Sequence, residues 1–247
     1  DLTAAEEHLV RALEILPGHV QSLTTLAELY RGRGDHLRAA KLFKEAAEGS
    51  SNRLDKARYM VLSAKEHLLG EERHKAGELL REVLAQDPEH NDAAQLMSEL
   101  YWQDGRFDDA LPLLEMLTRK EAERGTQVVR LTRLAQASLG AGLRDKARRA
   151  YRRALELEPK DLGALRGLLP LLVETGQFVD ARQISETLVT EHHDALGPSE
   201  EADLLATLGQ AEMSLGNSDA ALTALQKARA LTPMHRQALA QLRRVEQ

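Results

Sequence analysis

Residues 26–46 read LAELYRGRGDHLRAAKLFKEA, and this stretch decides the fold. It contains two patterns of apolar residues with the spacing of an amphipathic helix, separated by Gly32 to Asp35. Glycine in such a short break is typical of a tight turn between two helices. One short helix pair cannot bury its apolar face alone, so the stretch predicts neighbouring copies that stack upon it.

The second half of this stretch recurs along the chain as Ala, three residues, an aromatic or aliphatic residue, two residues, then Ala, Val or Leu. Ser185 is the one departure at the middle position. The anchor is alanine every time, which indicates that two helices approach closely there and that a larger side chain would overpack the contact. The seven copies are Ala5-Leu9-Ala12, Ala39-Phe43-Ala46, Ala76-Leu80-Val83, Ala110-Leu114-Leu117, Ala147-Tyr151-Ala154, Ala181-Ser185-Leu188 and Ala221-Leu225-Ala228.

Glycines and prolines mark the helix ends at regular places. About five residues before most anchors lies a glycine that we expect in the left-handed conformation after the first helix, with Glu71 in the equivalent place of one copy; these are Gly34, Gly105, Gly142, Gly176 and Gly216. Twelve residues after four anchors lies a proline that ends the second helix: Pro17, Pro88, Pro159 and Pro233.

Together these features resemble the tetratricopeptide repeat family, with Leu26-Ala27-x2-Tyr30 followed by Ala39-x3-Phe43 as a close match to its pattern. The resemblance implies an all-α, right-handed superhelical solenoid of antiparallel helix pairs over residues 1–247. We expect a half repeat at 1–19, full repeats at 20–53, 57–90, 91–124, 128–161, 162–195 and 202–235, and a closing helix at 236–247.

Prolines close only every other repeat, and they are separated by 71, 71 and 74 residues. This favours a two-repeat unit copied in tandem, with second helices longer by about a turn in the copies without proline. Independent loop insertions at Arg53, Gly125 and Leu196 are the alternative. Two other prolines lie inside helical patterns: Pro112 falls in or just past a first turn, whereas Pro170 is expected to kink or break its helix.

Composition excludes several kinds of protein. The net charge of −6 and the eight aromatic residues count against nucleic-acid binding. The lack of cysteine excludes disulfides, iron–sulfur clusters and cysteine-ligated zinc. No apolar run approaches the roughly 18 residues of a membrane span, so no membrane insertion is expected. The cytoplasm and the periplasm remain equally open as compartments.

Nothing in the sequence indicates catalysis, a cofactor or a metal, so we expect a protein that is not an enzyme. The cluster Glu191–Asp194 places adjacent side chains on different faces of a helix, where they cannot easily share an ion. The pairs Arg148-Arg149 and Arg152-Arg153 indicate a solvated outer face, with an acidic docking partner as the alternative.

The resemblance implies a groove lined by the first helices. Their twelfth residue is Arg31 in the first full copy and is apolar in the five copies that follow: Leu68, Trp102, Leu139, Val173 and Met213. These side chains either pack between neighbouring helices or form an apolar ridge in the groove. Trp102 is the strongest single candidate, because tryptophan is enriched in binding hot spots. The polar residues expected around the ridge are Arg58, Lys65, Gln95, Glu99, Gln136, Arg166 and Gln210.

We therefore expect a non-catalytic scaffold that holds a peptide or helix segment of a partner protein in its concave groove. The alternative is a regulatory or substrate-presenting segment of a larger enzyme or of an envelope or secretion machine, such as one for exopolysaccharide export. Residues 1–16 supply a second helix without its first helix. We therefore also expect weak self-association or fraying there, and a further helix upstream.

Overall fold

The computed structural model describes residues 2–245, which form fourteen α-helices, one short 3-10 helix and no strand. Asp1, Glu246 and Gln247, at the ends of the expected half repeat and closing helix, lie outside this part, as does the side chain of Leu2. The chain divides into two compact units. The expected all-α helical repeat is thereby confirmed.

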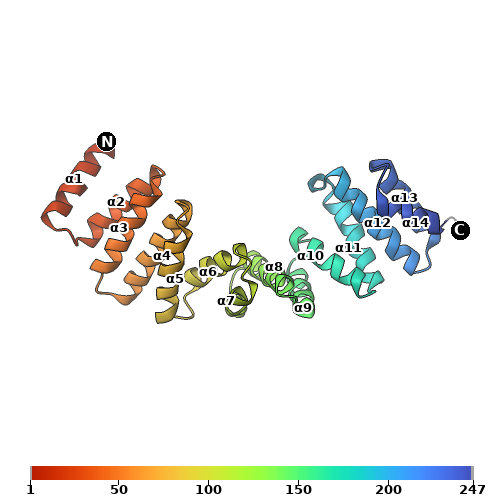
Figure 1. Ribbon diagram of the computed structural model, residues 1–247, viewed down its shortest axis with the longest axis horizontal. Helices are drawn as coiled ribbons and strands as arrows, with labels where there is room; N and C mark the ends of the chain where they lie inside the picture. Colours follow the sequence, from red (N-terminus) through yellow and green to blue (C-terminus); the bar gives the residue numbers. More distant parts are fainter. Residues whose placement is uncertain (1, 246–247) are drawn as a thin grey trace. The chain divides into compact units, whose positions relative to one another are not determined.

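Unit 1 ends at Arg119 and contains seven helices (Figure 1). They are α1 (Leu2–Ile15), α2 (Val20–Gly32), α3 (His36–Gly49), α4 (Arg53–Leu69), α5 (Arg73–Gln86), α6 (Asn91–Gln103) and α7 (Phe107–Arg119). Helices α2 and α3, α4 and α5, and α6 and α7 pack as pairs, and each pair also contacts the next. Helix α1 packs against α2.

Unit 2 begins at Lys120 and repeats the same plan. Its helices are α8 (Arg124–Gly140), α9 (Arg144–Leu157), α10 (Leu162–Glu174), α11 (Phe178–Glu191), α12 (Pro198–Ser214), α13 (Ser218–Leu231) and α14 (Arg236–Val245), with the 3-10 helix η1 (His193–Ala195) before α12. Helices α8 and α9, α10 and α11, and α12 and α13 form pairs, and α14 packs on both α12 and α13.

The alanine anchors of the six full copies lie where helices meet, and each is completely buried: Ala39, Ala76, Ala110, Ala147, Ala181 and Ala221. The larger residue four positions on is buried beside each anchor, as Phe43 and Tyr151 show. Ala5 is the exception, because it lies exposed on α1. The repeated anchor therefore marks the helix contacts that form the core of each unit.

The turn after each first helix has the left-handed residue that the sequence predicts. The glycines Gly34, Gly105, Gly142, Gly176 and Gly216 have φ between 70° and 83°. Glu71 fills this place after α4 with φ of 62°, and it is the one residue other than glycine with positive φ in the described chain. After it, the backbone N–H of Glu72 donates to the carbonyl of His67 at 2.8 Å, which closes the helix end.

The expectation of longer second helices is wrong. All second helices have 13 or 14 residues. The extra turn belongs instead to alternate first helices, because α4, α8 and α12 have 17 residues whereas α2, α6 and α10 have 13. Arg53 and Gly125 lie in the first turns of α4 and α8, so they are not loop insertions.

Proline affects the helices less than expected. Pro112 is the sixth residue of α7, just past its first turn, as the sequence indicates. Pro170 does not break its helix, since α10 continues from Leu162 to Glu174. Its ring lies on an exposed face. There it costs the helix one backbone hydrogen bond without disturbing a packed contact.

Candidate functional site

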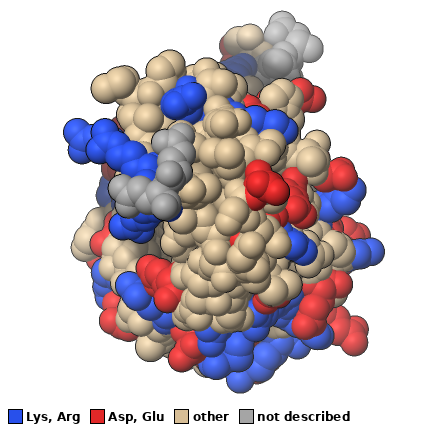
Figure 2. All heavy atoms as spheres, turned by 90° about the vertical axis from the view of Figure 1, so that its right-hand side faces the viewer, with Lys and Arg blue, Asp and Glu red and all other residues tan. Residues whose placement is uncertain are grey.

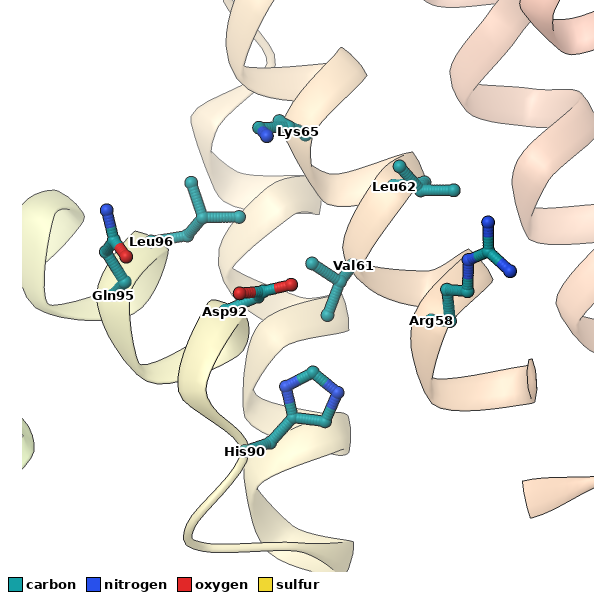
Figure 3. A pocket seen from close by; sticks show the side chains of 8 residues that line it. All are labelled: Arg58, Val61, Leu62, Lys65, His90, Asp92, Gln95 and Leu96. Carbon is teal, nitrogen blue, oxygen red and sulfur yellow. The ribbon is translucent and has the colours of Figure 1, made fainter. Parts of the chain in front are cut away.

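A depression of about 370 Å³ lies between the first helices α4 and α6 of unit 1. Its lining residues are Arg58, Val61, Leu62, Lys65, His90, Asp92, Gln95 and Leu96. Figure 3 shows Val61 and Leu96 pointing from the two helices toward the space between them, with Lys65 at one end and His90 at the other. The depression therefore has an apolar floor between polar margins.

Helical periodicity brings these side chains together. Arg58, Val61, Leu62 and Lys65 have the spacing i, i+3, i+4, i+7, so they lie on one face of α4. Asp92, Gln95, Leu96 and Glu99 follow the same spacing on α6. The start of α6 is fixed by His90, whose Nδ1 accepts from the backbone N–H of Ala93 at 3.3 Å.

A second depression, of about 460 Å³, adjoins the first at Leu96. It is lined by Leu68, Glu71, Arg73, Leu96, Glu99, Leu100 and Gln103. Arg73 closes its far end, because its guanidinium donates to Gln103 and to Asp104, both at 2.6 Å. We call the two depressions together the α4–α6 trough.

The two ends of the trough differ in charge. Arg58 and Lys65 are exposed, and neither has a hydrogen-bond or ion-pair partner among residues 2–245. Asp92 opposes them but lies in the first turn of α6, where the helix dipole favours a negative charge. Glu71 and Glu99 bring negative charge to the other end, where the single cation Arg73 is already paired. An extended ligand would therefore find a cationic end and an acidic end.

Five of the residues singled out in the sequence meet in this trough: Arg58, Lys65, Leu68, Gln95 and Glu99. Trp102, also on α6, is not among the residues that line it. The twelfth residues of the first helices are all half-buried, from Arg31 to Met213. Their burial is intermediate between that of a core position and that of an open ridge.

In unit 2, the candidates lie in separate places. Gln210 and Met213 line a depression of about 350 Å³ between α12 and α14, where the amide of Gln237 donates to that of Gln210 at 3.3 Å. Arg166 on α10 donates to Glu200 at 2.8 Å, so its charge is paired within the unit. Gln136, Leu139 and Val173 are half-buried on α8 and α10.

Figure 2 looks onto the end of unit 2 that carries α13 and α14. In this view uncharged side chains cover much of the centre, and charged ones lie around them on all sides. Leu231, at the end of α13, and Met234, in the turn after it, are exposed apolar residues of unit 2.

Sequence reasoning missed several trough residues, namely Val61, Leu62, His90, Asp92 and Leu96. A signal existed, because the spacing that links Arg58 to Lys65 also places Val61 and Leu62 on the same face of α4. What the sequence did not show is that α4 and α6 stay far enough apart to leave a hollow between these faces.

The region around Glu191 is a helix end held by local contacts. Glu191 pairs with Lys160 at 2.8 Å, which lowers the pKa of its carboxyl. The ring of His192 contacts the carbonyl of Lys160, also at 2.8 Å. Within residues 2–245 no three potential ligand side chains gather to hold a metal. No helix in that range is long and apolar enough to cross a membrane.

Comparisons with known proteins agree with the helical repeat. Two family models, each described as tetratricopeptide repeat, match residues 94–241 and residues 64–123. A search of curated proteins gave no significant match.

Several solved structures are similar in fold. One is the C-terminal part of a TPR repeat-containing protein from Cytophaga hutchinsonii, with a TM-score of 0.68, 15% identity, and coverage of 98% of this chain and 94% of that one. Pseudomonas aeruginosa pilF has a TM-score of 0.60 and 17% identity, with coverage of 92% of this chain and 97% of that one. YrrB, described as a TPR protein with an unusual peptide-binding site, has a TM-score of 0.51 and 17% identity, with coverage of 95% of this chain and 97% of that one.

Proposed function

Because this chain belongs to the tetratricopeptide repeat family, we propose that it is a protein-interaction scaffold whose α4–α6 trough binds a segment of a partner protein. Arrays of this kind expose long surfaces on stacked helices, and such surfaces suit binding rather than catalysis. The fold similarity to YrrB is in keeping with a peptide ligand.

The observation that carries the proposal is the pair of unpartnered cations beside an apolar floor. Arg58 and Lys65 lie two helical turns apart on α4, and Val61 lies between them. A partner segment with an acidic residue at each cation and an apolar residue between them would match this face. Charge complementarity of this kind mainly sets orientation and association rate, whereas the apolar contact supplies affinity.

The length of the trough sets the size of the ligand. From Arg58 to Leu68 the rise along α4 is about 15 Å, which corresponds to about four or five residues of extended chain. The cationic end of the trough would receive the acidic part of the segment, and the end near Glu99 would receive a neutral or basic part. The same trough would serve an array that forms one segment of a larger enzyme or export machine.

Site-specific photocrosslinking tests the proposal. A photoreactive amino acid replaces Gln95 in the trough, and in the control it replaces Lys41, whose side chain is 79% exposed on α3. We expect a discrete adduct from position 95, absent from position 41, that is lost when Lys65→Glu is added. Arg149→Glu, an exposed charge reversal on α9, should leave the adduct unchanged. Equal adducts from both positions, or an adduct that ignores Lys65→Glu, would contradict the proposal.

A further inference from the structure

Unit 1 has another hollow, of about 390 Å³, between the second helix α5 and the first helix α6. Met97 and Tyr101 of α6, and Asp104 just after it, line this hollow, whereas Gln95, Glu99 and Gln103 line the α4–α6 trough. Arg73 and Leu100 line both. Met97 and Tyr101 follow Gln95 and Glu99 by two residues each. Two residues correspond to about 200° around the helix axis, so the two pairs lie on different faces of α6. We call this hollow the α5–α6 pocket; it is lined chiefly by Arg73, Gly77, Arg81, Met97, Tyr101 and Arg106.

The floor of this pocket is open because α5 has a glycine in its middle. A Cβ on Gly77 would meet no atom nearer than Cδ1 of Leu100 at 4.0 Å, so packing does not require the glycine. Glycine inside a helix lowers stability relative to alanine. The residues at the same place in the other second helices all carry side chains: Ala40, Leu111, Arg148, Arg182 and Leu222. The missing side chain of Gly77 therefore makes the pocket at a cost to the helix.

The remaining floor is apolar and the margin is cationic. Met97 and Leu100 are buried beneath the pocket, and the ring of Tyr101 flanks it. The guanidinium of Arg106 stacks over Tyr101 at 4.5 Å from the ring centroid, while it also pairs with Asp109. Three arginines thus surround the pocket, against the single carboxylate of Asp104 in its lining.

Arg81 is the cation free to bind a ligand. Its Nε donates to the carbonyl of Gly77 at 3.1 Å, which fixes the side chain beside the pocket. Its two outer nitrogens have no partner among residues 2–245. A guanidinium held at one nitrogen with both others free is arranged for a carboxylate, which it can bind through two parallel hydrogen bonds.

We propose that the α5–α6 pocket is a second binding site, for a protein segment in which a carboxylate side chain lies next to an apolar one. The apolar side chain enters the space above Gly77 and contacts Met97 and Leu100. The carboxylate pairs with Arg81. Unit 1 then holds two segments on separate faces of α6, one in this pocket and one in the trough.

Selection from a displayed library of random linear peptides, with the full chain as bait, tests this site. Selected peptides are synthesised, and their Kd values are measured against wild type, Arg81→Gln, Gly77→Leu and the trough variant Lys65→Glu. We expect a family that pairs Asp or Glu with an apolar neighbour. Its Kd should rise about tenfold or more in Arg81→Gln, the scale of one charged hydrogen bond, rise similarly in Gly77→Leu, and stay unchanged in Lys65→Glu.

Leucine is tolerated at the matching places of α7 and α13, and thermal unfolding shows whether Gly77→Leu folds. If Gly77→Leu does not fold, the test rests on two other Kd measurements: the selected peptides with Arg81→Gln, and wild type with peptides whose acidic residue is replaced by its amide. Both changes should weaken binding. The proposal is overturned if no selected peptide depends on Arg81, or if the amide peptides bind as tightly as the acidic ones. Peptides whose Kd changes only with Lys65→Glu bind in the trough and not in this pocket.

Discussion

The ring of Tyr151 on α9 occupies the space in which Gly167 of α10 has no side chain. A Cβ on Gly167 would lie 2.2 Å from Cζ of Tyr151, far closer than atoms can approach. The large residue of one repeat and the glycine of the next thus form one contact. Other second helices have leucine in place of the tyrosine, as at Leu80 and Leu225. At Gly167 the three atoms nearest to an added Cβ all belong to the ring and hydroxyl of Tyr151.

Gly167→Ala should therefore destabilise the protein by about 1–3 kcal/mol, the usual cost of overpacking a core. Adding Tyr151→Leu should recover most of the loss that the alanine causes, because the shorter side chain vacates the space. Chemical denaturation of the two single variants and the double variant forms a cycle that measures this coupling. Additive effects in the cycle would show that the two residues do not share the contact.

The phenol of Tyr151 should also make stability depend on alkaline pH. Its side chain is 2% exposed, and burial raises the pKa of Tyr151 to about 12. The folded state thus favours the neutral phenol. This stabilisation is complete below pH ~10, the usual tyrosine pKa, and is lost as the pH rises toward 12.

The loss should reach about 3 kcal/mol, since one pKa unit corresponds to about 1.4 kcal/mol. Urea denaturation from pH 9 to 11.5 measures the part of it that develops in that window, with Tyr151→Phe as the matched control. The free energy of unfolding of the wild type should fall relative to that of the variant above pH ~10. Parallel curves for the two proteins would contradict the assignment.

Glu71 has a conformation that glutamate adopts at a cost. Its φ of 62° is that of the glycines in the equivalent turns, such as Gly105. Left-handed backbone costs about 1–2 kcal/mol for a residue with a Cβ. Glycine avoids this cost, but it also increases the conformational entropy of the unfolded chain, which offsets part of the gain in stability. Glu71→Gly should thus stabilise the fold by about 0.5–1 kcal/mol in chemical denaturation. Gly105→Ala, the reverse change in the next repeat, should destabilise it by a similar amount.

Much of the fold could be predicted because it depends on local chemistry. The glycines predict the left-handed turns, because glycine adopts positive φ without strain. The recurrence of alanine at one place in every repeat predicts the buried helix contacts. The proline spacing predicts the extra turn in the wrong helix, because these prolines mark where second helices end and not where first helices begin. The starting signal was Asn52, whose Oδ1 accepts from the N–H of Leu54 at 2.9 Å and caps α4.

The two-repeat period also appears in side-chain hydrogen bonds that could not be predicted from the sequence. Arg53 at the start of α4 donates to the carbonyl of Gln86, and Arg124, which starts α8 71 residues later, donates to that of Leu157. The trough could be predicted only in part. Its helix faces follow from periodicity, but its hollows depend on how far apart α4 and α6 pack, which no single-helix pattern contains.

Gly77 gives a contrast with Gly167. Gly77→Ala meets open space, since the nearest atom to the new Cβ is 4.0 Å away. Alanine should therefore stabilise α5 by about 0.5–1 kcal/mol through helix propensity. Thermal and chemical unfolding should both show the gain. A loss of stability instead would mean that the backbone at Gly77 is under a constraint that the structure does not display.

Exposed apolar residues lie on α1 and directly after it. Ile15 and Leu16 are 81% and 56% exposed at the end of this helix, and Val10 lies exposed one turn earlier. The inner side of α1 is held to α2 by Glu6, which accepts from the hydroxyl of Tyr30 at 2.7 Å. Exposed apolar side chains that lie close together favour contact with another surface, and in a pure solution that surface belongs to a second copy of the chain.

We therefore expect the sedimentation coefficient of the wild type to rise with protein concentration, and that of the double variant Ile15→Lys, Leu16→Lys to stay constant. Met234→Lys is the matched control, because Met234 is also 81% exposed but belongs to unit 2. It should sediment like the wild type, since a cation there leaves α1 untouched. A wild type that stays monomeric at every concentration would contradict self-association. If Met234→Lys abolishes self-association as completely as the double variant does, the contact between copies is not specific to α1.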